Sequence, residues 1–440
     1  MKKVFTCTGG LLLSFLLIST AYAGAIDNKT NWSAEYIRTL NRNAATDYAD
    51  IAAYNPAGTV KLHEGLTING SVQYLNKKYT NNVTHSLLGG TAEYESEEPS
   101  YVPGLFAVYN KDWWSLFGSV TVVAGGGKVD FSDGDYRLFK TAALVVLGGA
   151  PLCPFDPLDP FTFDPSKECD AFDPATQKLT AESYYLGYTL GTAFKVNEMF
   201  SLSMGLRYVN AHKELKASVT LYDGMTDYPT TAKFEQDGSG WGGIFGVNIA
   251  PNDKLNIGMR YETKTDINLE SSVPFGPGTI ILFNETPPII DDVLNPRDLP
   301  AIFAAGISYW VTPKLRIETN YTHYFNKDAD WAGEEDKVDD GFDLGVALEY
   351  HFNDSLLASI GYLYTVLGVD PGDMLPENPE LDANSVGAGI AYAISENLHT
   401  NISIGNSFYT DDSFTPQTLG GKVEYEKNVF YLAMGLEYRF

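Results

Sequence analysis

Hydrophobic and polar residues alternate along many segments of this chain. Over residues 342–352 every even position carries a large apolar side chain, whereas the odd positions include Asp343 and Glu349. Residues 430–440 repeat the pattern, again with large apolar side chains at the even positions. A period of two residues is typical of a β-strand with one apolar and one polar face. The chain is therefore predicted to consist largely of strands that separate an apolar from a polar environment.

The same pattern predicts fourteen strands, and an even number is expected for a closed single-chain membrane barrel. The predicted strands begin near residues 65, 100, 112, 181, 199, 232, 254, 298, 313, 337, 355, 381, 397 and 421. Tight turns alternate with seven longer connections, around residues 76–99, 126–180, 222–231, 271–297, 326–336, 368–380 and 410–420. The largest of them are 126–180 and 271–297. Outer-membrane barrels have short periplasmic turns and long external loops. We therefore expect an all-β fold, a 14-stranded antiparallel transmembrane β-barrel over residues 65–440, with both chain termini on the periplasmic side.

The N-terminal segment has the composition of a secretory signal peptide. Lys2 and Lys3 precede the apolar run 11–18, and Ala-Tyr-Ala at 21–23 provides a small-residue cleavage site. We expect residues 1–23 to be removed on export. Beyond them, no segment approaches the roughly 20 consecutive apolar residues of a membrane-spanning helix.

Composition narrows the possible functions. The chain has 56 acidic and 30 basic residues and a net charge of −26, so no nucleic-acid partner is expected, because phosphate recognition requires a basic face. The six His do not cluster with Cys or carboxylates at metal-ligand spacing, and no G-x-S-x-G turn is present. No metal, cofactor or catalytic site is predicted, although spacing alone leaves open a barrel hydrolase assembled from distant strands.

Residues 24–64 precede the first predicted strand. This Ala-rich, apolar segment is broken at Asn55-Pro56-Ala57-Gly58. Pro56 has no amide hydrogen and disfavours the helical conformation at Asn55, so a turn is expected there. Little else explains a segment of roughly 40 residues before a barrel, so we interpret it as a hatch that plugs the lumen. The alternative is that these four residues form an ordinary turn before a strand.

This segment resembles the N-terminal hatch of the FadL family of outer-membrane long-chain fatty acid and hydrocarbon transporters (OMPP1/FadL/TodX type). The likeness rests on the run from Asn41 to Gly58 with its Asn-Pro-Ala motif, on the strand that follows directly, and on the barrel size. The resemblance implies passive, ligand-gated uptake of a hydrophobic molecule and its lateral release into the membrane, with Asn55, Pro56 and Ala57 restricting passage. Fatty acids are the first expected ligands and aromatic or aliphatic hydrocarbons the second. An open porin for polar solutes is the competing class.

The third predicted strand runs from Trp113 to Ala124 and meets Gly125, Gly126 and Gly127. Glycine within a strand weakens pairing and permits a bend. The resemblance implies that a bend in this strand makes the lateral opening. The alternative is that the three glycines only begin the following loop.

Two apolar patches lie in the predicted external loops, and exposed apolar surface usually marks a contact site. The ligand-capture candidates are Leu144, Val145 and Leu147 in the first loop and Ile281, Leu282 and Phe283 in the second. Strand extension or self-packing of the loops is the alternative. The largest insertion follows strand 3, whereas the family has its large capture loop after strand 5, so we transfer no ligand contacts.

The first of these loops also contains Cys153 and Cys169, the only cysteines that remain after removal of the signal peptide. We expect them to form a disulfide in an oxidising compartment. The Asp-Pro turns around them offer carboxylates that suit calcium, but no spaced calcium-loop motif is present, so solvated acidic turns are favoured.

If the apolar residues face outward, five cationic side chains point into the lumen: Arg207, Lys213, Arg260, Lys264 and Arg316. One or more of them could pair with a fatty acid carboxylate, because a buried anion needs a compensating charge. Alternatively they pair with inward-facing carboxylates, namely Glu262, Glu318, Asp343 or Glu349. A hydrocarbon ligand would need none of these pairs. The expected partners are a hydrophobic small molecule, outer-membrane lipids and lipopolysaccharide, and the protein is expected to be a monomer.

Overall fold

The computed structural model describes residues 31–140, 177–222, 227–272, 294–417 and 419–440. Several predicted features lie outside the described residues: the signal peptide, Cys153 and Cys169, and the capture candidates Leu144, Val145, Leu147, Ile281, Leu282 and Phe283.

Short helices open the described chain and mark two of its connections. They are α1 (Ala34–Thr39), α2 (Ile51–Tyr54), and the 3-10 helices η1 (Pro56–Lys61), η2 (Ser86–Leu88), η4 (Asn326–Asp328) and η5 (Glu334–Lys337). None of the helices in the described part of the chain is both long enough and apolar enough to cross a membrane.

The remaining elements are strands. They are β1 (Gly65–His85), β2 (Gly90–Lys111), β3 (Trp114–Phe131), β4 (Lys178–Lys195), β5 (Phe200–Tyr222), β6 (Asp227–Asn252), β7 (Leu255–Glu262), β8 (Asn268–Ser272), β9 (Leu294–Pro296), β10 (Ala301–Thr312), β11 (Leu315–Phe325), β12 (Gly341–Asn353), β13 (Leu356–Val366), β14 (Ala383–Ala393), β15 (Leu398–Tyr409), β16 (Asp412–Phe414) and β17 (Lys422–Arg439).

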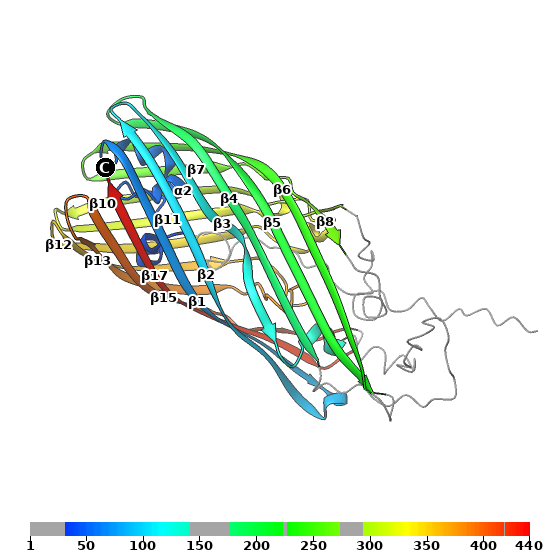
Figure 1. Cartoon of the computed structure of the whole chain (residues 1–440). Coiled ribbons are helices and arrows are strands. Elements are labelled where there is room, and N and C mark those ends of the chain that lie inside the picture. The colour runs from blue at the N-terminus through cyan, green and yellow to red at the C-terminus, as the bar shows by residue number, and fades with distance from the viewer. Residues whose placement is uncertain (1–30, 141–176, 223–226, 273–293, 418) are drawn as a thin grey trace, which may run out of the picture.

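Among the described residues, fourteen of these strands close one antiparallel barrel in chain order (Figure 1). The barrel closes between β17 and β1, whose pairing runs from Thr67 opposite Arg439 to Thr84 opposite Lys422. The short strands β8, β9 and β16 add to the wall at the end of the long connections. The predicted fold class, a closed 14-stranded antiparallel barrel, is confirmed.

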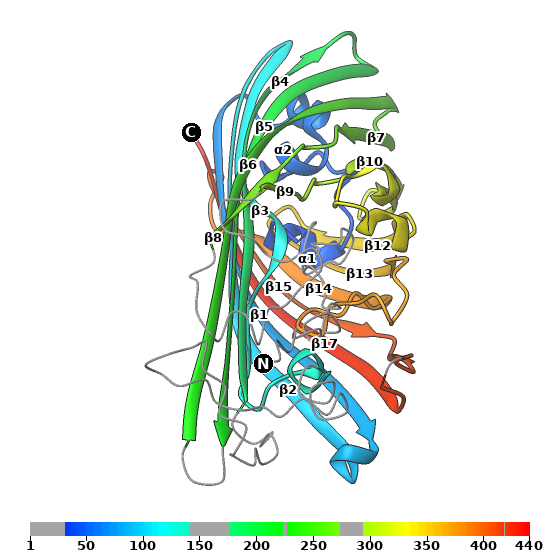
Figure 2. The same cartoon turned by 90° about the vertical axis from the view of Figure 1, so that its right-hand side faces the viewer.

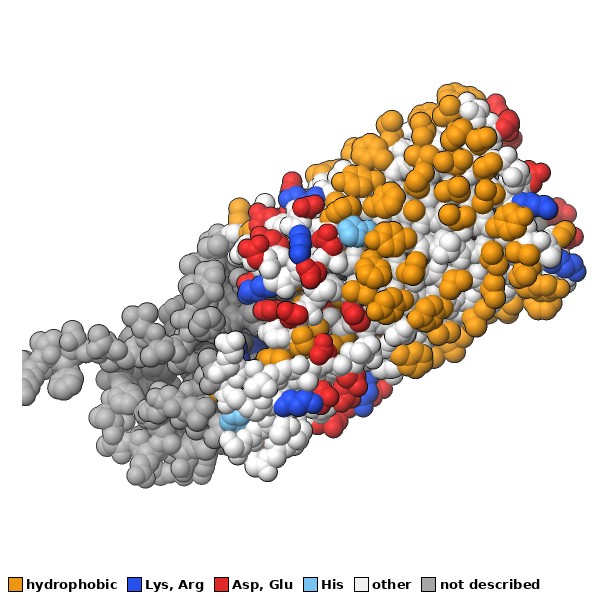
Figure 3. Space-filling view, turned by 180° about the vertical axis from the view of Figure 1, so that it is seen from behind, with side chains coloured by type: hydrophobic (Ala, Val, Ile, Leu, Met, Phe, Trp, Pro, Cys, Tyr) orange, Lys and Arg blue, Asp and Glu red, His pale blue; other side chains and the backbone are white. Residues whose placement is uncertain are grey.

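A belt of apolar side chains covers the outside of the barrel (Figure 3). On β12, Leu344, Val346 and Leu348 are about half exposed, while Asp343 and Glu349 are buried on the inner face. The alternation in the sequence therefore reflects lipid on one side of the wall and a polar lumen on the other. Figure 3 shows charged side chains on both sides of the belt.

The expected loop over residues 76–99 is wrong. β1 continues to His85 and β2 begins at Gly90, so the two strands form one long hairpin, with Thr84 still opposite Thr91. Along much of this hairpin, large apolar residues no longer mark one face. The hairpin instead carries cross-strand ion pairs such as that between Lys78 and Glu95 (2.6 Å). The sequence pattern fades there, although the backbone ladder continues.

Residues 31–64 lie inside the barrel, near the end where the tight turns and the C-terminus are found (Figures 1 and 2). Most of their side chains are fully buried. The helix α1 begins because the Ser33 hydroxyl accepts a hydrogen bond from the Tyr36 amide (3.0 Å), and it ends at Leu40, which has a positive φ of 54°. The described part of the hatch is therefore an ordered plug enclosed by the wall.

Candidate functional site

Inward-facing glycines on several strands make room for the backbone of the hatch. A Cβ built on Gly361 of β13 would lie inside 3.0 Å of the carbonyl group of Thr39, a distance that real Cβ atoms essentially never show. We name the residues of this kind the hatch-contact glycines: Gly258, Gly306, Gly345, Gly361 and Gly387. Four of them meet the backbone of the hatch segment 37–44, and Gly345 meets the side chain of Asn41, so this segment lies directly against the inner wall.

Charged side chains fasten the hatch to the same part of the wall. Arg38 of α1 is ion-paired with Glu349 of β12 and donates a hydrogen bond to the Ser359 hydroxyl of β13 (2.8 Å). The amide of Ala44 donates to Glu318 (3.1 Å). Because these groups are buried, their loss would leave uncompensated charges in the lumen.

A second charged cluster lies within the hatch itself. Arg42 contacts Asp47 (2.7 Å) and Asp50 (2.5 Å), and Asp50 also accepts a hydrogen bond from Ser33 (2.8 Å). Burial, with the nearby charge of Asp50, raises the pKa of Glu35 to about 8. The Glu35 carboxyl group is therefore protonated over most of the neutral range.

The predicted restriction consists of four consecutive residues that are all buried in the lumen: Asn55, Pro56, Ala57 and Gly58. The Asn55 side chain donates a hydrogen bond to Asn248 of β6 (2.8 Å), and the carbonyl of Ala57 accepts one from Ser201 of β5 (2.6 Å). A Cβ on Gly58 would lie 2.5 Å from Nδ2 of the Asn55 side chain. The motif thus docks the hatch against β5 and β6, and its role in restricting passage stays a prediction.

The hydrogen-bonded pairing of the wall is interrupted between β2 and β3. Their ladder ends at Gly104 opposite Thr121. Both strands continue beyond this point, but β2 then pairs only with β1 and β3 only with β4. A Cβ on Gly127 would lie 3.3 Å from the Cβ of Ser100, so the two strands come together again there. We call the interval between these two points, residues 101–103 of β2 and 122–126 of β3, the lateral window.

The three predicted glycines lie at this window. The β3 register against β4 shifts between Val122 and Ala124 and again between Ala124 and Gly127. Gly125 has φ 99° and Gly127 has φ 70°, in the left-handed region that glycine adopts readily. Figure 1 shows β3 turning away from β2 along this part of its length. The prediction that Gly125, Gly126 and Gly127 bend the strand agrees with this geometry, whereas their role as an exit stays a prediction.

Two buried side chains donate hydrogen bonds to carbonyl groups of β3 that have no partner on β2. Neither residue was predicted from the sequence. The Trp32 indole Nε1 donates to the carbonyl of Val122 (2.9 Å). Lys77 of β1 donates from Nζ to the carbonyls of Gly126 (2.5 Å) and Lys128 (2.8 Å). No local sequence signal marks either contact, because the partners are about 50 to 90 positions apart.

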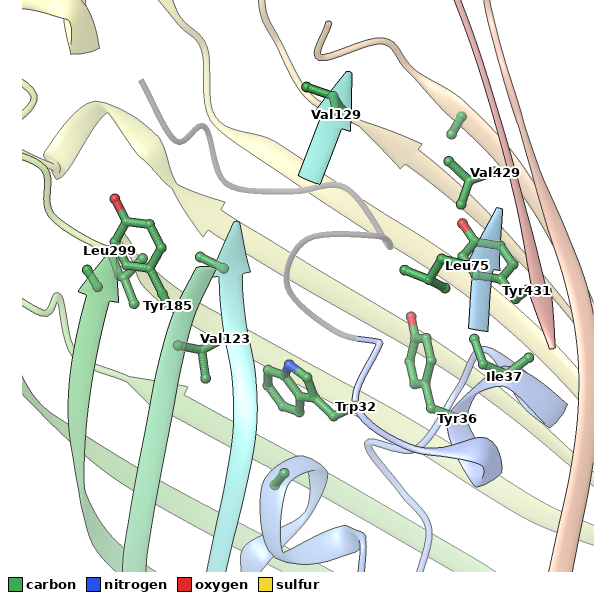
Figure 4. Close-up of a cluster of buried hydrophobic side chains, with 14 of the residues drawn as sticks. Trp32, Tyr36, Ile37, Leu75, Val123, Val129, Tyr185, Leu299, Val429 and Tyr431 are labelled. Carbon is green, nitrogen blue, oxygen red and sulfur yellow. The ribbon is translucent and has the colours of Figure 1, made fainter. Parts of the chain in front are cut away.

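The inner side of the window is apolar. Figure 4 shows Trp32, Val123 and Tyr185 on neighbouring elements around it, with Leu75 and Tyr36 close by. All five side chains belong to one cluster of buried hydrophobic residues. A hydrophobic molecule in this region would exchange water contact for apolar contact.

The three predicted arginines form ion pairs with carboxylates of the protein. Arg207 and Arg260 share Glu262, and Arg316 is paired with Glu318. The carbonyl of the hatch residue Ala53 also accepts a hydrogen bond from Arg260 (2.5 Å). These guanidinium groups hold the hatch and the wall together in the present structure.

The two predicted lysines lie apart from these arginines. Lys264 contacts Asp298 (2.7 Å) and Asp266 (3.0 Å). Lys213 is buried on the inner face of β5, opposite Ser183 of β4. Pairing of any of the five predicted cations with a ligand carboxylate stays a prediction. The described residues contain no group of His, Cys, Asp or Glu arranged to hold a metal ion.

A plugged barrel with an apolar outer belt and an interruption in its wall is the architecture of an outer-membrane transport protein. Residues 180–440 match the family described as "Outer membrane protein transport protein (OMPP1/FadL/TodX)". The match covers more than half of the chain, and the protein belongs to this family. It is an outer-membrane transport protein.

Solved structures share the fold at low sequence identity. A Pseudomonas aeruginosa FadL homologue superposes with a TM-score of 0.67 at 12% identity, over 93% of this chain and 98% of that one. The Pseudomonas putida toluene transporter TodX gives 0.62 at 14% identity, over 93% and 98%. The Ralstonia pickettii toluene transporter TbuX gives 0.56 at 14% identity, over 92% and 98%. No curated protein matches the sequence.

Proposed function

We propose that this protein takes up long-chain fatty acids passively and releases them through the lateral window into the outer membrane. The observation that carries the proposal is the interruption of the wall between Gly104 and Gly127, beside a lumen that the hatch fills. A water-filled pore is a poor route for an alkyl chain, because each exposed methylene costs about 0.8 kcal/mol. A lateral route passes the ligand from the apolar cluster at the inner side of the window directly to the apolar membrane.

The polar groups near the window support a ligand with a carboxylate head. The hydroxyls of Ser183 and Tyr185 are buried and have no hydrogen-bond partner among the described residues. Both belong to β4 at the bend of β3, and Lys213 stands opposite Ser183. Buried hydroxyls beside the buried Lys213 amine provide donors for an anion, and a bound anion would favour the charged form of the amine. We assign this group as the fatty acid head site.

Aromatic hydrocarbon uptake is the second candidate. It is favoured by the ion pairs of Arg207, Arg260 and Arg316, whose charges the protein's own carboxylates already balance. It is also supported by the fold shared with the toluene transporters TodX and TbuX.

Uptake of radiolabelled oleate and toluene in a transporter-deleted host separates the two candidates. With Lys213→Met, oleate uptake should fall while toluene uptake stays unchanged. If wild-type protein carries toluene only, or if Lys213→Met leaves oleate uptake intact, the fatty acid assignment is wrong. Large steady currents through wild-type protein in planar bilayers would instead favour an open porin.

We further propose that the protein works as a monomer in contact with lipopolysaccharide. The apolar belt gives every membrane-facing strand a lipid surface. Above it, the β5–β6 hairpin carries Lys216 and Lys233, both within ion-pair distance of Glu214 (2.5 and 2.9 Å). Ammonium groups at this level suit lipid phosphates. Light scattering of the detergent-solubilised protein tests the oligomeric state.

A further inference from the structure

The β2–β3 ladder ends where β2 can no longer supply a donor. Gly104 is the last β2 residue paired with β3, and it stands opposite Thr121. One step further, the same register would place Pro103 opposite Val122. Proline has no N–H, so it cannot donate a ladder hydrogen bond to β3. The carbonyl of Val122 therefore needs a donor from elsewhere.

The hatch supplies that donor. Trp32 is 1% exposed, and its indole Nε1 donates to the Val122 carbonyl (2.9 Å). The backbone of Trp32 lies against the same point, because a Cβ on Gly104 would come within 3.0 Å of the Trp32 carbonyl oxygen. Trp32 thus contacts both strands at the place where their ladder ends.

Other hatch groups and luminal arginines hold Trp32 in this position. Its amide donates to the Tyr54 hydroxyl (3.0 Å), and the two rings lie 5.1 Å apart. The guanidinium groups of Arg207 and Arg260 lie 5.7 and 5.8 Å from the centre of the indole. Because Arg260 also binds the hatch carbonyl of Ala53 (2.5 Å), a shift of the hatch would move the surroundings of the indole as well.

We propose that Trp32 is a positioning residue that couples the hatch to the lateral window. Its indole N–H replaces the donor that Pro103 lacks and keeps β3 bent away from β2. When the hatch leaves its docked position, the Val122 carbonyl loses its partner and the window changes shape. The proposal rests on the proposed function, because a window matters only if cargo leaves through it.

The first test removes only the indole N–H. Trp32→Phe keeps an aromatic ring in place, and Trp331→Phe is the matched control, because the buried Trp331 donates from Nε1 to the Asp298 carbonyl (2.8 Å) away from the window. Spin labels are attached at the exposed positions Glu97 of β2 and Lys128 of β3, in a background in which Cys153 and Cys169 are replaced by Ser. Electron paramagnetic resonance then measures the distance between the two strands.

We expect Trp32→Phe to broaden the distance distribution and to lower oleate uptake by about tenfold, the factor expected when one buried carbonyl loses its donor. Trp331→Phe should change neither. An unchanged distribution in Trp32→Phe, or an equal change in Trp331→Phe, overturns the proposal. If the distribution broadens as expected but wild-type protein carries no oleate, the coupling holds and the proposed function fails.

A second variant separates coupling from stability. Pro103→Ala restores an N–H on β2 opposite Val122. In the double variant Trp32→Phe, Pro103→Ala the thermal stability should return toward that of wild type, because the Val122 carbonyl regains a donor. Oleate uptake should stay low in this variant, because the β2–β3 ladder now extends into the window. Recovery of uptake together with stability would show that Trp32 only stabilises the fold, and would overturn the proposal. Pro103→Ala alone should lower uptake with the hatch intact, and full activity in that variant counts against the proposal.

Discussion

Replacing Gly361 by alanine should loosen the hatch without harming the barrel. Gly361 faces the lumen on β13, and the new methyl group would lie inside 3.0 Å of the carbonyl carbon and oxygen of Thr39, and 3.0 Å from its Cα. All three are backbone atoms, so no side-chain rotation relieves the overlap. Ordinary van der Waals contact begins at 3.4 Å, and the peptide of Thr39 must therefore move away from the wall.

Overpacking of this kind costs about 1–3 kcal/mol. If the hatch escapes by undocking, that cost raises the undocked fraction by about 5-fold to 150-fold, since about 1.4 kcal/mol corresponds to a factor of ten. Gly70→Ala is the matched control, because Gly70 is also a strand glycine but a Cβ there meets nothing within 4 Å. The two variants lose the same backbone freedom and differ in the contact with the hatch.

Planar-bilayer recording provides the assay. Wild type and Gly70→Ala should be nearly silent, and Gly361→Ala should show frequent openings as the lumen becomes passable to ions. Equal conductance in Gly361→Ala and Gly70→Ala would refute the reasoning that the hatch-contact glycines hold the plug in place.

Three further predictions concern the hatch and the bend. Glu349→Gln leaves the buried Arg38 without its charged partner, should cost about 3–5 kcal/mol, and is expected to expose the hatch to protease; unaltered protection would contradict it. The raised pKa of Glu35 means that the docked hatch holds its proton more tightly than the undocked hatch does. Docking should therefore weaken, and conductance rise, as pH increases from about 4.5 through about 8, and Glu35→Gln should reduce this dependence. Gly125→Val would force a β-branched residue into φ 99° against the backbone of Ser183, and should lower oleate uptake at least tenfold relative to Gly70→Ala; normal uptake would show that the bend is dispensable.

The barrel was predictable from the sequence because lipid and lumen impose opposite polarity on alternate residues. The predicted strand starts near 355 and 397 lie within a residue of β13 and β15 in the structure. Prediction failed over 76–99, where the hairpin carries polar residues on both faces and the period of two no longer reports the strand. The alternation of apolar and polar residues reports whether a strand separates lipid from lumen, and it does not report backbone pairing.

The candidate site was only partly predictable. Gly125 and Gly127 were readable, because glycine is the residue that a left-handed bend requires. The end of the β2–β3 ladder was predictable in principle from Pro103, since proline within a strand indicates a missing ladder hydrogen bond. The hatch-contact glycines look like any small residue on an inward face, and the bond from Trp32 to Val122 joins residues 90 positions apart. Such contacts depend on the closed barrel.

A reversible link between β2 and β3 at the end of the lateral window tests most directly whether cargo leaves between these strands. The Cβ of Ser100 lies 3.3 Å from the position of a Cβ on Gly127, close to the spacing of about 3.5–4.5 Å in disulfides. In a background with Cys153→Ser and Cys169→Ser, the double variant Ser100→Cys, Gly127→Cys should lose oleate uptake when oxidised and regain it when reduced. Equal uptake in the oxidised and reduced forms would contradict lateral release.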